Sequence, residues 1–151
     1  MRRRICLALF LAAVSPALLA ADGEETAAVK DVIQQFHQAL EGHDVAAIGA
    51  LVSADVVVLE NGHRNDGWPD FRDNHLIPEF KEPASSSKWE FVKVAASSEM
   101  ARGYTKQTIG ITGKDGKHGG YLVWSAYILH PSESGACLEG GSARLERQAI
   151  E

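Results

Sequence analysis

The spacing of apolar residues changes partway along the chain, and this change restricts the fold more than any other feature of the sequence. In the first part, apolar residues recur at helical spacing, at Val29, Val32, Ile33, Phe36 and Leu40. From residue 89 onward the period becomes two, which is typical of β-strands. Helices followed by strands predict an α+β fold in which one face of an antiparallel sheet wraps the helices.

Residues that typically begin or end helices divide the helical part into separate elements. A long helix begins near Asp22 and ends at Gly42, and Asp44 is placed to cap a short helix that runs to residue 52. A β-branched strand at 55–60 follows, and the polar segment 63–66 after it is a solvated loop or a gate over a cavity. A third helix is expected to start at Pro69 and to stop before Pro78.

The remaining elements are strands. The three serines at 85–87 suggest a flexible connector. Alternation then predicts strands beginning at residue 89 and spanning 101–112 and 120–130, with a hairpin turn at 114–117.

The N-terminus has the three-part layout of a secretory signal peptide. Three arginines at 2–4 precede an apolar run at 5–14 and a stretch of small residues. We expect residues 1–20 to be removed, with cleavage after Ala20 or Ala21, and the protein to be periplasmic or secreted. The alternative is a retained anchor, but a bilayer span needs about 20 apolar residues, so no stable membrane anchor is expected.

Charge and cysteine content narrow the possible partners. The chain has 15 Lys and Arg against 20 Asp and Glu, a net charge of −5, and no basic cluster outside its first four residues. Binding to nucleic acid is therefore not expected. Loss of the signal peptide would also remove Cys6 and leave Cys137 alone, so no disulfide within the chain is expected.

The order of these elements, together with two short motifs, resembles a known superfamily. The motifs are Val56-Val57-Val58-Leu59-Glu60-x-Gly62 after the helical hairpin and Phe71-x-x-x-His75-Leu76 on the third helix. Over residues 27–130 the chain resembles the nuclear transport factor two-like superfamily, in its SnoaL-like, ketosteroid-isomerase-like branch. The resemblance implies a cone-shaped, curved antiparallel sheet around a helical hairpin and a third helix. It also implies an apolar pocket between sheet and helices and a homodimer, but no particular reaction.

The C-terminal tail departs from that pattern. Relatives close with a Trp-containing strand, whereas residues 137–151 are rich in Gly and polar residues and predict no strand. Read one base later from the codon of Leu138, the same DNA can encode Trp-Lys-Val-Val-x-x-Asp-Trp-Ser, which fits the pattern. We therefore place the domain at 21–135 and treat 136–151 as an atypical tail. A frameshift between about His130 and Cys137 is one explanation of the tail, and a divergent disordered ending is the other.

Within this resemblance, Glu60 and His75 are the candidate catalytic residues. Glu60 ends the first strand, and His75 lies on the helix that closes over the pocket in relatives. A carboxylate beside an imidazole can move a proton near neutral pH. The alternative is a structural hydrogen bond that fixes the loop to the helix.

Aromatic side chains are the candidate ligand-binding residues. They are Trp68, Phe71, Trp89, Tyr104, Trp124 and Tyr127. Their rings would form the walls for a small apolar molecule, although strand alternation places Trp124 and Tyr127 on opposite faces unless a bulge intervenes.

Two functions remain open at this level. One is an exported, cofactor-free acid–base enzyme of the isomerase, cyclase or hydrolase type. The other is a non-catalytic dimerisation or partner-binding module of the same fold. The six histidines show no paired metal-ligand spacing, so no metal site is expected, and no cofactor is expected either.

Overall fold

The computed structural model describes residues 16–81, 86–112, 118–132 and 135–148, so most of the predicted signal peptide and the predicted turn at 114–117 lie outside it. The helical elements are α1 (Pro16–Glu41), α2 (Val45–Leu51), α3 (Trp68–Phe71), the π-helical turn η1 (Arg72–Leu76) and α4 (Ile77–Glu79). The strands are β1 (Val52–Glu60), β2 (His63–Asp66), β3 (Ser86–Ala96), β4 (Ala101–Thr112), β5 (His118–Ser132) and β6 (Gly135–Gln148).

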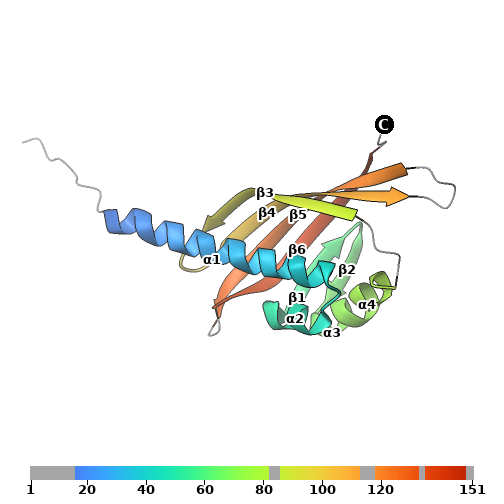
Figure 1. Cartoon of the computed structure of the whole chain (residues 1–151). Helices are drawn as coiled ribbons and strands as arrows, with labels where there is room; N and C mark the ends of the chain where they lie inside the picture. The colour runs from blue at the N-terminus through green and yellow to red at the C-terminus, as the bar shows by residue number, and fades with distance from the viewer. Residues whose placement is uncertain (1–15, 82–85, 113–117, 133–134, 149–151) are drawn as a thin grey trace, which may run out of the picture.

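The six strands form one sheet in the order β2-β1-β6-β5-β4-β3, and α1 lies across one of its faces (Figure 1). The predicted α+β class is confirmed. The sheet is mixed, however, because β1 and β6 run parallel while the other neighbours are antiparallel. The expectation of a wholly antiparallel sheet is therefore corrected at this one pair.

The apolar stripe of α1 forms the centre of the core, as its spacing predicts. Val29, Ile33 and Phe36 are all buried against the sheet. Ile33 packs directly over Gly103 of β4, where an added Cβ would collide with the Ile33 Cδ1 atom. A glycine at this position therefore lets the helix approach the sheet closely.

Helix α1 starts earlier than the sequence suggests. It begins at Pro16 and passes through the predicted cleavage point at Ala20 or Ala21. Cleavage there would leave the helix beginning at the new N-terminus. Among the described helices none is both long and apolar enough to span a bilayer.

The segment 63–66 is not a loop, and this prediction was wrong. It forms β2, which pairs antiparallel with β1. The connecting residues Asn61 and Gly62 have φ angles of 49° and 85°, the left-handed conformation that a tight two-residue hairpin turn requires. The turn sets the strand pairing here, because the side chains of β2 carry no apolar alternation.

The third helix also continues further than predicted. Pro78 lies inside α4 instead of ending the helix. In the preceding turn the Ile77 N–H bonds to the Arg72 carbonyl, five residues back, so the chain is already wider than an α-helix before the proline. This local change of winding accommodates a residue that would otherwise clash with the preceding turn. Ser86 and Ser87, expected in a connector, begin β3.

The largest correction concerns the tail. Residues 135–148 form β6, which lies between β1 and β5 and pairs with both. The sequence predicted no strand because the middle of β6 is Gly140-Gly141-Ser142-Ala143. Two flanking strands supply backbone partners whatever the side chains are, and Leu138 is buried in the core.

The frameshift hypothesis stays a prediction. Glycines weaken a strand and leave positions beside Tyr127 and Val57 without side chains. We expect a chain with the restored Trp-Lys-Val-Val frame to melt several degrees higher than the chain with the Gly-rich tail, measured by circular dichroism on both. Equal melting temperatures, or an uninterrupted frame in independent sequencing reads, would contradict the hypothesis.

Candidate functional site

The β1–β2 hairpin and the third helix together build a polar site. Glu60 is the last residue of β1, and the tight turn after it returns the chain along β2. Gly67, with φ 81°, then turns the chain into α3, and its N–H bonds to the Val56 carbonyl at 2.8 Å. The following helical segment places His75, in the π-helical turn, over the end of β1.

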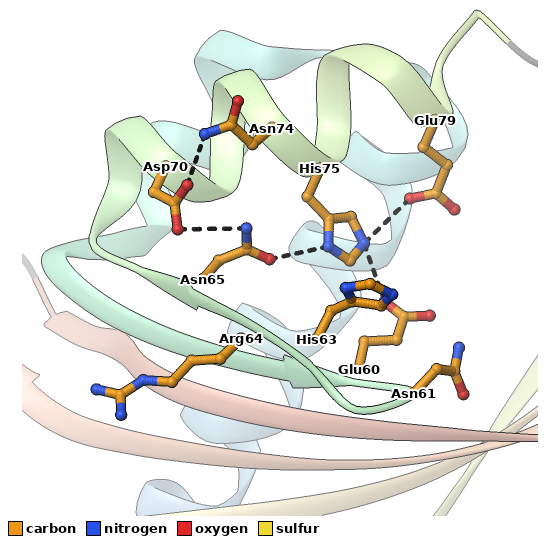
Figure 2. Close-up of a pocket in the computed structure, with 9 residues that line it drawn as sticks. All are labelled: Glu60, Asn61, His63, Arg64, Asn65, Asp70, Asn74, His75 and Glu79. Carbon is orange, nitrogen blue, oxygen red and sulfur yellow. Dashed lines mark hydrogen bonds and ion pairs between the residues drawn. The ribbon is translucent and has the colours of Figure 1, made fainter.

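Glu60 and His75 meet as the sequence predicted (Figure 2). The His75 Nε2 atom lies 3.0 Å from Glu60 Oε2 and 3.6 Å from Glu79 Oε2. Glu79 is one helical turn beyond His75, which is the spacing that could have marked it in the sequence. The His75 side chain is 18% exposed, so it is mostly shielded from solvent but still open to the site.

The electrostatics of the site favour a protonated imidazole. The hydrogen bond to Glu60 raises the pKa of His75 above its usual 6.5, partial burial opposes that rise, and the charges of Glu60 and Glu79 add to it. His75 therefore keeps its proton to a higher pH than an exposed histidine does, which suits a general acid.

The opposite ring nitrogen of His75 has its own partner. Nδ1 lies 3.0 Å from Asn65 Oδ1, and Asn65 Nδ2 lies 3.4 Å from Asp70 Oδ2. Asp70 also accepts hydrogen bonds from the Asp66 N–H at 2.9 Å and from Asn74 Nδ2 at 2.7 Å. Those bonds lower the pKa of Asp70 and keep it ionised. Asn65 and Asp70 were missed in the sequence because β2 was read as a loop.

A cavity of about 520 Å³ opens beside this network. The nine lining residues are all polar or charged: Glu60, Asn61, His63, Arg64, Asn65, Asp70, Asn74, His75 and Glu79. None of the six aromatic candidates is among them. Within the described part of the chain, no cluster of three His, Cys, Asp or Glu residues has the geometry of a metal site.

The aromatic candidates separate into three groups, and their binding role stays a prediction. Phe71 packs edge-to-face against His75 with ring centroids 5.3 Å apart, and Trp68 packs against Phe71. Trp89 and Tyr127 lie on the inner face of the sheet, against α1. Tyr104 and Trp124 lie on the outer face, 38% and 42% exposed. The expected separation of Trp124 from Tyr127 is confirmed.

The inner group surrounds a histidine that the sequence analysis did not single out. His37 of α1 is buried, stacks on Trp89 with a centroid distance of 4.2 Å, and its Nε2 is 3.0 Å from the Tyr127 hydroxyl. Burial lowers the pKa of His37 to about 4, so it is neutral at pH 7. Its position four residues after Ile33, on the apolar stripe, is the signal that could have found it.

No protein-family model and no curated protein matches the chain, whereas solved structures do. The chain is similar to a ketosteroid isomerase-like protein from Erwinia carotovora atroseptica, with 17% identity, a TM-score of 0.71, and coverage of 81% of this chain and 96% of that one. It is similar to a conserved protein from Planctomyces limnophilus, with 17% identity, a TM-score of 0.72, and coverage of 83% and 99%. An NTF2-like protein with a cystatin-like fold from Novosphingobium aromaticivorans matches with 13% identity, a TM-score of 0.67, and coverage of 85% and 84%.

These similarities show the fold. The chain has the α+β cone fold of nuclear transport factor two-like and ketosteroid-isomerase-like proteins, as its sequence resemblance implied. One fold of this kind hosts many reactions, and the chemistry depends on the residues of the site.

Proposed function

We propose that this protein is an acid–base enzyme that binds a small molecule in the polar cavity and moves a proton through His75 and Glu60. The observation that carries the proposal is the 3.0 Å contact between His75 Nε2 and Glu60 Oε2 at the cavity wall. A His–Glu pair that only stabilises the fold does not need to lie at a cavity, so its position at the cavity wall favours a role in catalysis.

The two residues have complementary roles. Before the transfer, the Glu60 carboxylate stabilises the imidazolium of His75. His75 then donates its Nε2 proton to a carbonyl or leaving-group oxygen and becomes neutral, and Glu60 accepts a proton from the ligand. Proton transfer of this kind suits an isomerase, a cyclase or a hydrolase-like enzyme, and it needs no cofactor. The lining offers amides, carboxylates and imidazoles, so it favours a polar ligand over the apolar molecule expected from the sequence.

Hydrogen–deuterium exchange tests the proposal without a known substrate. The purified protein is incubated in D₂O with a panel of small hydroxyketones and keto acids, and deuterium uptake next to the carbonyl is followed by NMR. We expect exchange of at least one compound, lowered about 100-fold or more in His75→Gln and Glu60→Gln.

A second His–Glu pair in the same molecule supplies the control. His130 Nε2 lies 3.1 Å from Glu139 Oε2, and neither residue lines the cavity. His130→Gln removes an equivalent ion pair and should leave the exchange rate unchanged. No exchange with any compound, or a full rate in His75→Gln, would refute the proposed activity.

We further propose that the protein acts outside the cytoplasm. The support is the layout of residues 1–20 described above. N-terminal sequencing of protein recovered from a bacterial host should find a chain that starts at Ala21 or Asp22. A chain with an intact Met1 in the cytoplasm would contradict this.

A non-catalytic module is the second candidate, favoured by the outer face of the sheet. Tyr104, Trp124 and Ile128 are exposed on adjacent strands there, opposite the helices. We propose that this face forms a homodimer. Trp124→Glu should then give a monomer by light scattering, whereas Gln34→Glu on the exposed side of α1 should not. A wild-type protein that is monomeric at micromolar concentration would exclude this interface.

A further inference from the structure

Asn65 is a buried polar residue that touches the proposed catalytic histidine from the side away from Glu60. It is 8% exposed and lies between His75 and Asp70. We propose that Asn65, oriented by Asp70, is a positioning residue that fixes the tautomer of His75 and makes Nε2 the nitrogen that exchanges the proton. This inference rests on the proposed function, but its main test does not require activity.

The orientation of the Asn65 amide follows from Asp70. An ionised carboxylate only accepts hydrogen bonds, so the NH₂ end of the amide has to face it. Asp70 is itself fixed by the Asp66 N–H and by Asn74. Reversing the amide would place its carbonyl oxygen against the carboxylate and its NH₂ group against His75. The carbonyl end of Asn65 therefore faces His75 Nδ1.

The orientation of Asn65 in turn fixes the proton on His75. A carbonyl oxygen accepts only, so the bond to Asn65 calls for a hydrogen on Nδ1 in both charge states of the ring, in competition with Glu60, which calls for one on Nε2. Nε2 is then the nitrogen that gains and loses the proton, and it faces Glu60 and Glu79 at the cavity. Phe71, four residues before His75, packs edge-to-face against the imidazole and carries no charge. The four groups around the imidazole thus give the two nitrogens different roles: Nδ1 holds the ring in place through its bond to Asn65, and Nε2 exchanges the proton at the cavity.

Nitrogen-15 NMR of histidine-labelled full-length protein tests the assignment directly. The His75 signals are identified by their loss in His75→Gln, and the tautomer is determined above the pKa of His75. Wild-type protein is expected to show a protonated Nδ1 and a bare Nε2. Asn65→Leu should shift the neutral ring toward the Nε2–H form and lower the pKa of His75, because the acceptor for Nδ1–H is gone.

Three further variants separate positioning from general damage. Asn65→Asp keeps an acceptor and should retain the Nδ1–H form. Asp70→Ala leaves Asn65 in place but frees its amide to rotate, and should give a mixture of tautomers. Asp73→Ala breaks the Arg72–Asp73 ion pair on the same helical segment, lies outside the cavity lining, and should behave like wild type. Because Asp70 is only partly buried, its variant keeps the test valid even if Asn65→Leu does not fold.

The outcomes distinguish this inference from the proposed function. A tautomer change in Asn65→Leu or Asp70→Ala, with exchange in D₂O at least about tenfold slower at unchanged KM, supports the positioning role. An unchanged Nδ1–H tautomer in both variants overturns it. If wild-type protein exchanges no compound while the tautomers change as expected, the proposed function fails and the assignment of the His75 proton to Nδ1 stands.

Discussion

Replacing Phe36 by alanine is expected to lower the free energy of unfolding by about 3–5 kcal/mol. Phe36 is 8% exposed and packs edge-to-face on Tyr127, with centroids 6.1 Å apart. Its removal takes a large apolar surface out of the contact between α1 and the sheet and leaves a cavity where neighbouring elements cannot easily close in. Urea unfolding followed by circular dichroism measures the change.

An exposed residue on the same helix is the matched control. Gln34→Ala alters α1 without touching the core and should change stability by less than about 0.5 kcal/mol. A loss below about 1 kcal/mol for Phe36→Ala would mean that α1 does not pack on the sheet in this register.

The second large effect is acid destabilisation through His37. Burial lowers the pKa of His37 to about 4 in the folded protein, against 6.5 when exposed. A proton therefore binds more tightly to the unfolded chain, so stability is full above pH 6.5 and falls as the pH drops from 6.5 to about 4. A difference of that size corresponds to a loss of about 3 kcal/mol.

His37→Phe isolates this contribution. The pKa of His75 is raised, so His75 acts in the opposite sense and its stabilisation is lost as the pH rises. Comparing wild type with His37→Phe at pH 7 and pH 4 cancels the His75 effect, which both proteins share. The variant should lose about 3 kcal/mol less than wild type between the two pH values in urea unfolding. Parallel losses in both proteins would show that His37 is not buried as described.

Much of this structure follows from local patterns in the sequence. The period of 3.6 in α1 reports directly on its buried stripe, and the predicted bounds of β4 match those observed. These features depend on residues that carry the signal themselves. The proximity of Glu60 and His75 was expected on different grounds, from the family resemblance, in which the helix that carries His75 closes over the pocket.

The missed features depend on partners distant in sequence. β2 has no apolar alternation, and its pairing is set by the turn before it. β6 is held by β1 and β5 on its two sides, so its own weak strand propensity does not decide its state. Asn65 and Asp70 have a role only after β2 is placed beside the third helix, so no pattern within residues 63–70 could have indicated it.

The position of β6 bears on the order in which the molecule can assemble. β6, the last of the described strands, joins the β1–β2 hairpin to the β3–β4–β5 meander, and in the described sheet no other strand lies between them. Strands β1 and β2, which carry Glu60 and Asn65, are synthesised early. β1 can pair with its second neighbour only after β6 (Gly135–Gln148) has left the ribosome. Pairing across so long a stretch of chain is slow. A delay of this kind keeps the two halves of the sheet apart until β6 has been synthesised and can pair with both.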